Sequence, residues 1–78
     1  MRATIYRGPR DIRVETVPDA ALRLPTDALI RVTHACICGS DLWPYRDGGR
    51  PDGARMGHEF MGVVEAVGAD VSGFKVGD

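Results

Sequence analysis

The strongest constraint on this chain is an alternation of apolar and polar side chains that recurs in several segments. It is longest in residues 27–37, where one face carries Ile30, Val32, His34 and Cys36. A period of two is typical of a β-strand, because successive side chains point to opposite faces. This face is apolar until it reaches histidine and cysteine. We therefore predict that the strand buries this face and presents any metal-ligating side chains at its end.

Other segments show the same period. Residues 1–7 and 11–17 alternate on either side of the turn-forming residues 8–11, which predicts an antiparallel hairpin. Residues 61–68 predict a further strand, and residues 71–78 predict a turn that leads towards another strand. The 10 glycines and 5 prolines favour short strands and tight turns over long helices.

One short helix is expected between these strands. Ser40 or Asp41 can cap a helix over residues 42–45, where Pro44 is tolerated in the first turn. Residues 47–55 are rich in glycine, proline, aspartate and arginine, which indicates an exposed loop. The predicted fold class is therefore mainly β with a short helix.

Charge and cysteine content exclude several classes of function. The formal net charge is −1, and both signs are mixed along the 78 residues, which argues against a nucleic-acid or anionic-membrane surface. No apolar stretch approaches the roughly 20 residues of a membrane-spanning helix. The only cysteines, Cys36 and Cys38, are too close in sequence for a disulfide. We therefore expect a reduced, cytoplasmic protein that forms one small domain or part of a larger one.

Three residues could bind a metal ion. Cys38, His58 and Glu59 offer a thiolate, an imidazole and a carboxylate, which are donors that Zn²⁺ accepts. Three protein ligands would leave a position open for water or substrate, as in a catalytic site. Spacing alone leaves the alternative open that Cys38 is a small core residue. For His34 and Cys36, packing in the core is the better interpretation.

Two sequence motifs bear on whether Cys38 binds a metal ion or packs in a core. Residues 36–42 read Cys-Ile-Cys-Gly-Ser-Asp-Leu, and residues 57–62 read Gly-His-Glu-Phe-Met-Gly, followed by Gly68 and Val71. Together they resemble the zinc-dependent medium-chain alcohol dehydrogenases, although Cys36 stands where glycine is usual in that family. The opening hairpin and the closing residues also fit, so the resemblance covers essentially the whole chain. Metal binding is then favoured over core packing.

The resemblance implies a role for each polar residue of the two motifs. Cys38 and His58 would be ligands of a catalytic zinc, and Glu59 would be the adjacent carboxylate that coordinates the metal in some members. Asp41 would accept a hydrogen bond from the far nitrogen of His58 and fix its ring. Ser40 would lie beside the substrate alcohol and pass its proton outward.

The resemblance also implies the fold and the reaction. Residues 1–78 would form the N-terminal part of a GroES-like β-barrel, the catalytic domain of a longer enzyme. That enzyme would oxidise a small alcohol, or reduce a carbonyl compound, by zinc-assisted hydride transfer with NAD or NADP, and would be a homo-oligomer. The sequence has no G-x-G-x-x-G motif for a dinucleotide. We therefore expect the Rossmann domain and the third protein ligand to lie outside these residues, and this part alone to be inactive.

Two alternatives follow from the same motifs. A GroES-like barrel without chemistry could act as an assembly or interaction module, but such a module does not need a thiolate and an imidazole at one point. A zinc-free quinone reductase relative is disfavoured by Cys38 and by the pair His58 and Glu59.

Overall fold

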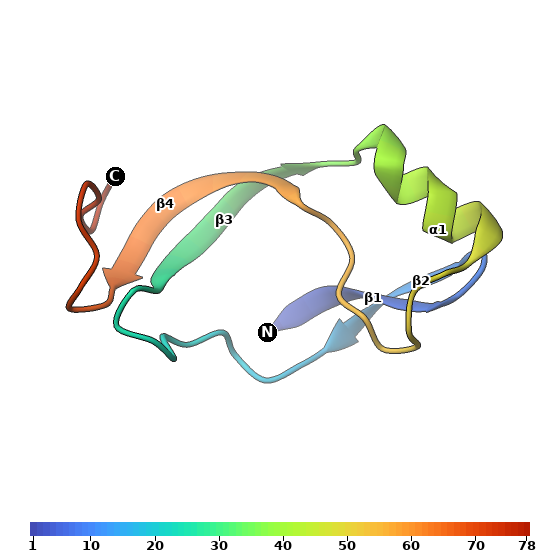
Figure 1. The fold of residues 1–78 in the computed structure, drawn as a ribbon, viewed down its shortest axis with the longest axis horizontal. Coiled ribbons are helices and arrows are strands. Elements are labelled where there is room, and N and C mark those ends of the chain that lie inside the picture. Colours follow the sequence, from blue (N-terminus) through green and yellow to red (C-terminus); the bar gives the residue numbers. More distant parts are fainter. The chain divides into compact units, whose positions relative to one another are not determined.

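The computed structural model describes residues 1–78 and has four strands, a 3₁₀ turn and one short helix (Figure 1). Their bounds are β1 Arg2–Gly8, β2 Asp11–Thr16, β3 Ala28–Cys36, the 3₁₀ turn Gly39–Asp41, α1 Leu42–Asp47 and β4 Glu59–Val67. The mainly β prediction is confirmed, and each predicted strand is present with its ends shifted by at most two residues. The chain divides into a first unit, Met1–Pro18 with Cys36–Glu59, and a second unit, Asp19–Ala35 with Phe60–Asp78.

The first unit begins with the predicted hairpin. β1 and β2 pair antiparallel from Arg2 opposite Thr16 to Tyr6 opposite Ile12, and the register shifts between Tyr6 and Gly8. In the connecting turn Arg10 adopts the left-handed conformation, with φ of 61°. The alternating pattern therefore correctly predicts that β1 and β2 pair, and the shift in register makes room for the turn between them.

A small core surrounds β1. Ile5 and Tyr6 are 2% and 1% exposed, and Met56 is 8% exposed. Backbone hydrogen bonds join β1 to residues 53–56, so the end of the predicted exposed loop lies alongside this strand. The Tyr6 hydroxyl donates to the carbonyl oxygen of Pro44 in α1 at 3.0 Å. Tyr6 therefore connects three parts of the first unit, namely the hairpin to which it belongs, the helix and residues 53–56.

The second unit consists mainly of β3 and β4, which form a two-stranded sheet and run in opposite directions (Figure 1). Two glycines allow close backbone approach: a Cβ on Gly62 would lie 2.3 Å from the carbonyl oxygen of Arg31, and one on Gly68 would lie 2.1 Å from that of Pro25. Val64, 7% exposed, is the one buried apolar side chain of this unit. The predicted turn over residues 71–78 is present, and its end exchanges hydrogen bonds with the backbone of Val64.

The prediction of a buried face on β3 was wrong. Val32 is 53% exposed, and His34 and Cys36 are exposed as well, so neither of the latter is a core residue. A two-stranded sheet buries a face only where another layer packs against it. The alternation therefore specified the strand correctly but not its burial.

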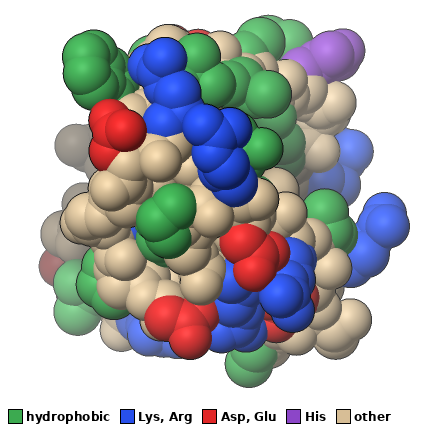
Figure 2. All heavy atoms as spheres, turned by 90° about the vertical axis from the view of Figure 1, so that its right-hand side faces the viewer, with side chains coloured by type: hydrophobic (Ala, Val, Ile, Leu, Met, Phe, Trp, Pro, Cys, Tyr) green, Lys and Arg blue, Asp and Glu red, His purple; other side chains and the backbone are tan.

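Large apolar side chains also remain exposed elsewhere in both units. Ile37 is 80% exposed, and Val14, Trp43 and Phe74 are 64–65% exposed. On the face drawn in Figure 2, apolar side chains lie at the surface between charged ones. The buried core is therefore small for the number of apolar residues. No helix has the length and apolarity needed to cross a membrane.

Candidate metal centre

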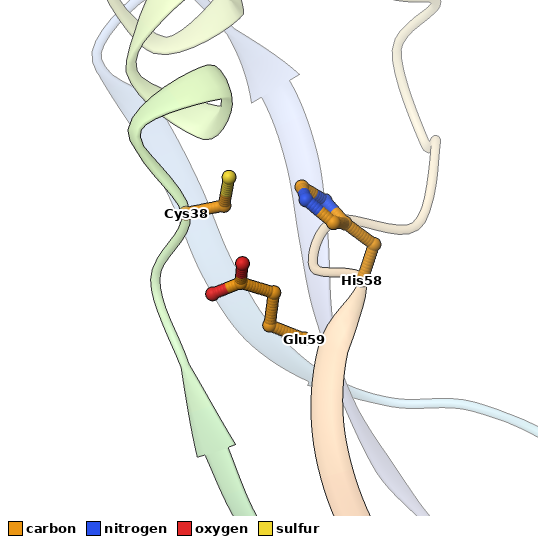
Figure 3. A group of neighbouring side chains, drawn as sticks. All are labelled: Cys38, His58 and Glu59. Carbon is orange, nitrogen blue, oxygen red and sulfur yellow. The ribbon is translucent and has the colours of Figure 1, made fainter.

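Cys38, His58 and Glu59 converge within the first unit. Their ligand atoms all lie within 4.8 Å of one another, and the three side chains point towards a common space (Figure 3). Cys38 directly precedes the 3₁₀ turn, while His58 directly precedes β4 and Glu59 is its first residue. The structure thus brings together the three residues that the sequence offered as metal ligands, although twenty positions separate the thiol from the imidazole.

The 3₁₀ turn fixes the backbone of Cys38. The N–H of Cys38 donates to the Asp41 carboxylate at 3.0 Å, and the N–H of Asp41 donates to the carbonyl oxygen of Cys38, also at 3.0 Å. Asp41 was expected to cap the α-helix, but its side chain makes no such hydrogen bond. It instead satisfies the backbone donor at the start of the preceding turn. The sequence feature from which this contact could have been predicted is the three-residue spacing from Cys38 to Asp41, which resembles a capping box.

Asp41 also contacts the imidazole. Its side chain is only 12% exposed, and its Oδ1 lies 3.2 Å from Nδ1 of His58, whose side chain is 49% exposed. A proton on Nδ1 that is donated to this carboxylate leaves Nε2 with a free lone pair. One buried carboxylate therefore holds the Cys38 backbone with one oxygen and orients the His58 ring with the other.

Ser40 lies in the same turn, with its hydroxyl directed at the thiol. Its Oγ donates to Sγ of Cys38 at 3.2 Å. The sequence predicted that Ser40 would lie near a substrate, and this contact with sulfur was not predicted. The only sequence feature that could have suggested this contact is the two-residue separation of Cys38 and Ser40 within a turn.

The donor set fits a zinc ion. A tetrahedral zinc with bond lengths of about 2.0–2.3 Å holds its ligand atoms about 3.3–3.8 Å apart. The Cys38, His58 and Glu59 atoms lie within 4.8 Å, so small side-chain rotations would bring them to that separation. His58 and Glu59 are exposed, which leaves one side of the cluster open. Three donors with an open side are typical of a catalytic rather than a structural site.

Neighbouring residues do not join this cluster. Cys36 is a free, exposed thiol outside the group of three.

Trp43, at the start of α1, is exposed, and its ring lies 5.7 Å from the Arg46 guanidinium. The ring therefore stacks against a cation of its own helix rather than packing in a core.

Comparisons with known proteins point to one family. The family model described as the alcohol dehydrogenase GroES-like domain matches residues 24–78. The zinc-type alcohol dehydrogenase-like protein AdhB of Bacillus subtilis is 41% identical over all of this chain, and formaldehyde dismutase of Pseudomonas putida is 40% identical over 99% of it. Among solved structures, alcohol dehydrogenase TADH from Thermus sp. ATN1 superposes over the whole chain with a TM-score of 0.91 and 42% identity.

The matches cover only part of each relative. The chain spans 21% of the two proteins named first and 23% of the Thermus enzyme. It therefore corresponds to about a fifth of the length of the proteins that it resembles.

Proposed function

The chain belongs to the alcohol dehydrogenase GroES-like domain family, and we propose that it carries part of the active site of a zinc-dependent alcohol dehydrogenase. The observation that carries the proposal is the convergence of Cys38, His58 and Glu59, held in place by the buried carboxylate of Asp41. The reaction would convert a small alcohol into an aldehyde or ketone, or the reverse. In the forward direction the alcohol loses a hydride to NAD⁺ or NADP⁺ and a proton to solvent.

Cys38 and His58 would hold the zinc through Sγ and Nε2. Glu59 would be a further ligand or would alternate with water, and another protein ligand would come from residues outside these 78. A bound zinc supplies a Lewis acid that polarises the alcohol or carbonyl oxygen. Asp41 would keep the His58 ring in the tautomer that leaves Nε2 free. Ser40, which is exposed beside Cys38, would accept the proton of the alcohol and pass it outward.

The nicotinamide would be bound by residues outside these 78. The sequence contains no G-x-G-x-x-G motif, and the relatives are about five times longer. Residues 1–78 would form the N-terminal part of the catalytic domain, and they would have no alcohol dehydrogenase activity alone. The cytoplasm suits the two free cysteines. The full-length enzyme would be a homo-oligomer that acts on small molecules and binds neither nucleic acid nor a membrane.

The zinc content of the full-length protein tests the proposal. We expect Cys38→Ser to lose the bound zinc and the NAD(P)-linked oxidation of alcohols together. Cys36→Ser is the matched control, because that thiol is two residues away and outside the cluster. It should keep both properties. Retention of the full zinc content in Cys38→Ser, measured by elemental analysis, would remove the central assignment.

A further inference from the structure

The hydrogen bond from Ser40 Oγ to Cys38 Sγ is not explained by the role proposed above for Ser40. A hydroxyl has one proton and two lone pairs, and in this structure the proton is directed at the sulfur. The lone pairs remain open to an incoming donor. Ser40 can therefore accept a hydrogen bond from a substrate alcohol while it donates to the sulfur, and it would release the sulfur when its own proton passes outward.

The geometry of the turn favours this contact. The N–H and the C=O of Cys38 both bond to Asp41, so the backbone is fixed on each side of Ser40. Cys38 is extended, with φ of −83° and ψ of 147°, and the turn begins at the next residue. The 3.2 Å contact between oxygen and sulfur thus arises within a hydrogen-bonded turn rather than in a free loop.

We propose that Ser40, besides its part in proton transfer, tunes the Cys38 thiolate through this hydrogen bond. The inference rests on the proposed function, because it requires Cys38 to be a metal ligand. A hydrogen bond to a ligating thiolate is charge-assisted and draws electron density away from the sulfur. A Cys38 thiolate that gives less charge to a bound metal would leave that metal a stronger Lewis acid towards a substrate oxygen.

The test uses the full-length protein loaded with Co²⁺ in place of zinc. Transfer of an electron from sulfur to cobalt gives an absorption band whose energy falls as the sulfur becomes more electron-rich. Ser40→Val and Ser40→Thr form a matched pair, because their side chains have the same shape and only threonine has the hydroxyl. We expect the band to shift to longer wavelength in Ser40→Val and to stay close to that of wild type in Ser40→Thr.

The outcomes separate this inference from the proposed function. If wild type shows no sulfur-to-cobalt band, Cys38 is not a ligand, and both ideas fail. If wild type shows a band that Cys38→Ser loses, and both Ser40 variants keep that band at the same wavelength, the tuning role is wrong while ligation by Cys38 stands. A variant that does not fold is replaced by Ser40→Ala, for which the same shift to longer wavelength is expected. A purely structural role for Ser40 would not move the band.

Discussion

The two units of this chain are stabilised in different ways. The first unit buries three of the four buried apolar side chains, Ile5, Tyr6 and Met56, and also the Asp41 carboxylate. The second unit buries only Val64 and depends on close backbone contact at Gly62 and Gly68. All three candidate metal ligands lie in the first unit. A site that must hold side chains in fixed positions thus lies in the better-packed unit.

The largest effect is expected from Tyr6→Ala. Tyr6 is 1% exposed and joins β1, α1 and residues 53–56, so its removal leaves a cavity at the centre of the first unit. We expect a loss of about 3–5 kcal/mol in the free energy of unfolding, measured by denaturant titration. Tyr6→Phe should lose only about 1 kcal/mol, for the hydrogen bond to Pro44. Val14→Ala, at a 65% exposed position, is the control. If all three variants are equally stable, this unit has no such core.

Gly68→Ala should be the most damaging small change in the second unit. The added methyl group would lie 2.1 Å from a backbone oxygen of Pro25, so the backbone itself must move. We expect a loss of about 1–3 kcal/mol in the free energy of unfolding. Hydrogen exchange should show the loss of protection first in β3 and β4. Gly39→Ala is the control, because no atom lies within 4 Å of its Cβ position. Equal stability of the two variants would contradict the close-approach argument.

Asp41→Asn tests whether the first unit positions the metal ligands. The carboxylate accepts from Cys38 N–H and from the His58 ring, whereas an amide has only one accepting oxygen. One of the two contacts must then place donor against donor. We expect zinc affinity to fall about 10–100-fold, measured by competition with a chelator. Asp47→Asn, at the exposed end of α1, should leave the affinity unchanged. Unchanged affinity in Asp41→Asn would contradict the positioning role.

The sequence predicted the elements well because alternation is a local property. All four strands and the helix are present, and the expected GroES-like fold is confirmed by the family match. Burial was not predicted, because it depends on what packs against a strand. His34 and Cys36 lie on the apolar face of their strand and are nevertheless exposed. Periodicity identifies the face of a strand that could be buried but not whether another layer covers it.

The candidate site was likewise predicted only in part from the sequence. Cys38, His58 and Glu59 were identified from residue type and motif, and the structure brings them together. The second contact of Asp41 and the hydroxyl-to-sulfur bond of Ser40 were not predicted. Both depend on the tight 3₁₀ turn, whereas the sequence suggested only a short α-helix. Contacts that a side chain makes with a residue two or three positions away require the backbone geometry to be known.

The smallest expected effect distinguishes the two units by their electrostatics. In the first unit, a two-point hydrogen bond from the Arg7 guanidinium lowers the pKa of Glu15. In the second, backbone N–H groups of Leu24 and Arg23 lower the pKa of Asp27. Each carboxylate is favoured by folding, so each stabilises the protein above its unfolded pKa. This stabilisation is lost as the pH falls through the lowered folded value.

Added salt should distinguish the two causes of a lowered pKa, the side-chain ion pair at Glu15 and the backbone hydrogen bonds at Asp27. The pairing of Arg7 with Glu15 is between side chains that are 34% and 31% exposed and is weakened by added ions, whereas the turn that holds Asp27 is made by the backbone. In NMR titrations at high salt, we expect the pKa of Glu15 to rise towards its ordinary value and that of Asp27 to stay low. Asp27→Asn should also remove part of the acid sensitivity of β3 and β4 in hydrogen exchange, and Asp70→Asn serves as its control. If salt raises both pKa values equally, long-range charge rather than the local turn lowers the pKa of Asp27. The second unit would then depend on backbone contacts less than its glycines suggest.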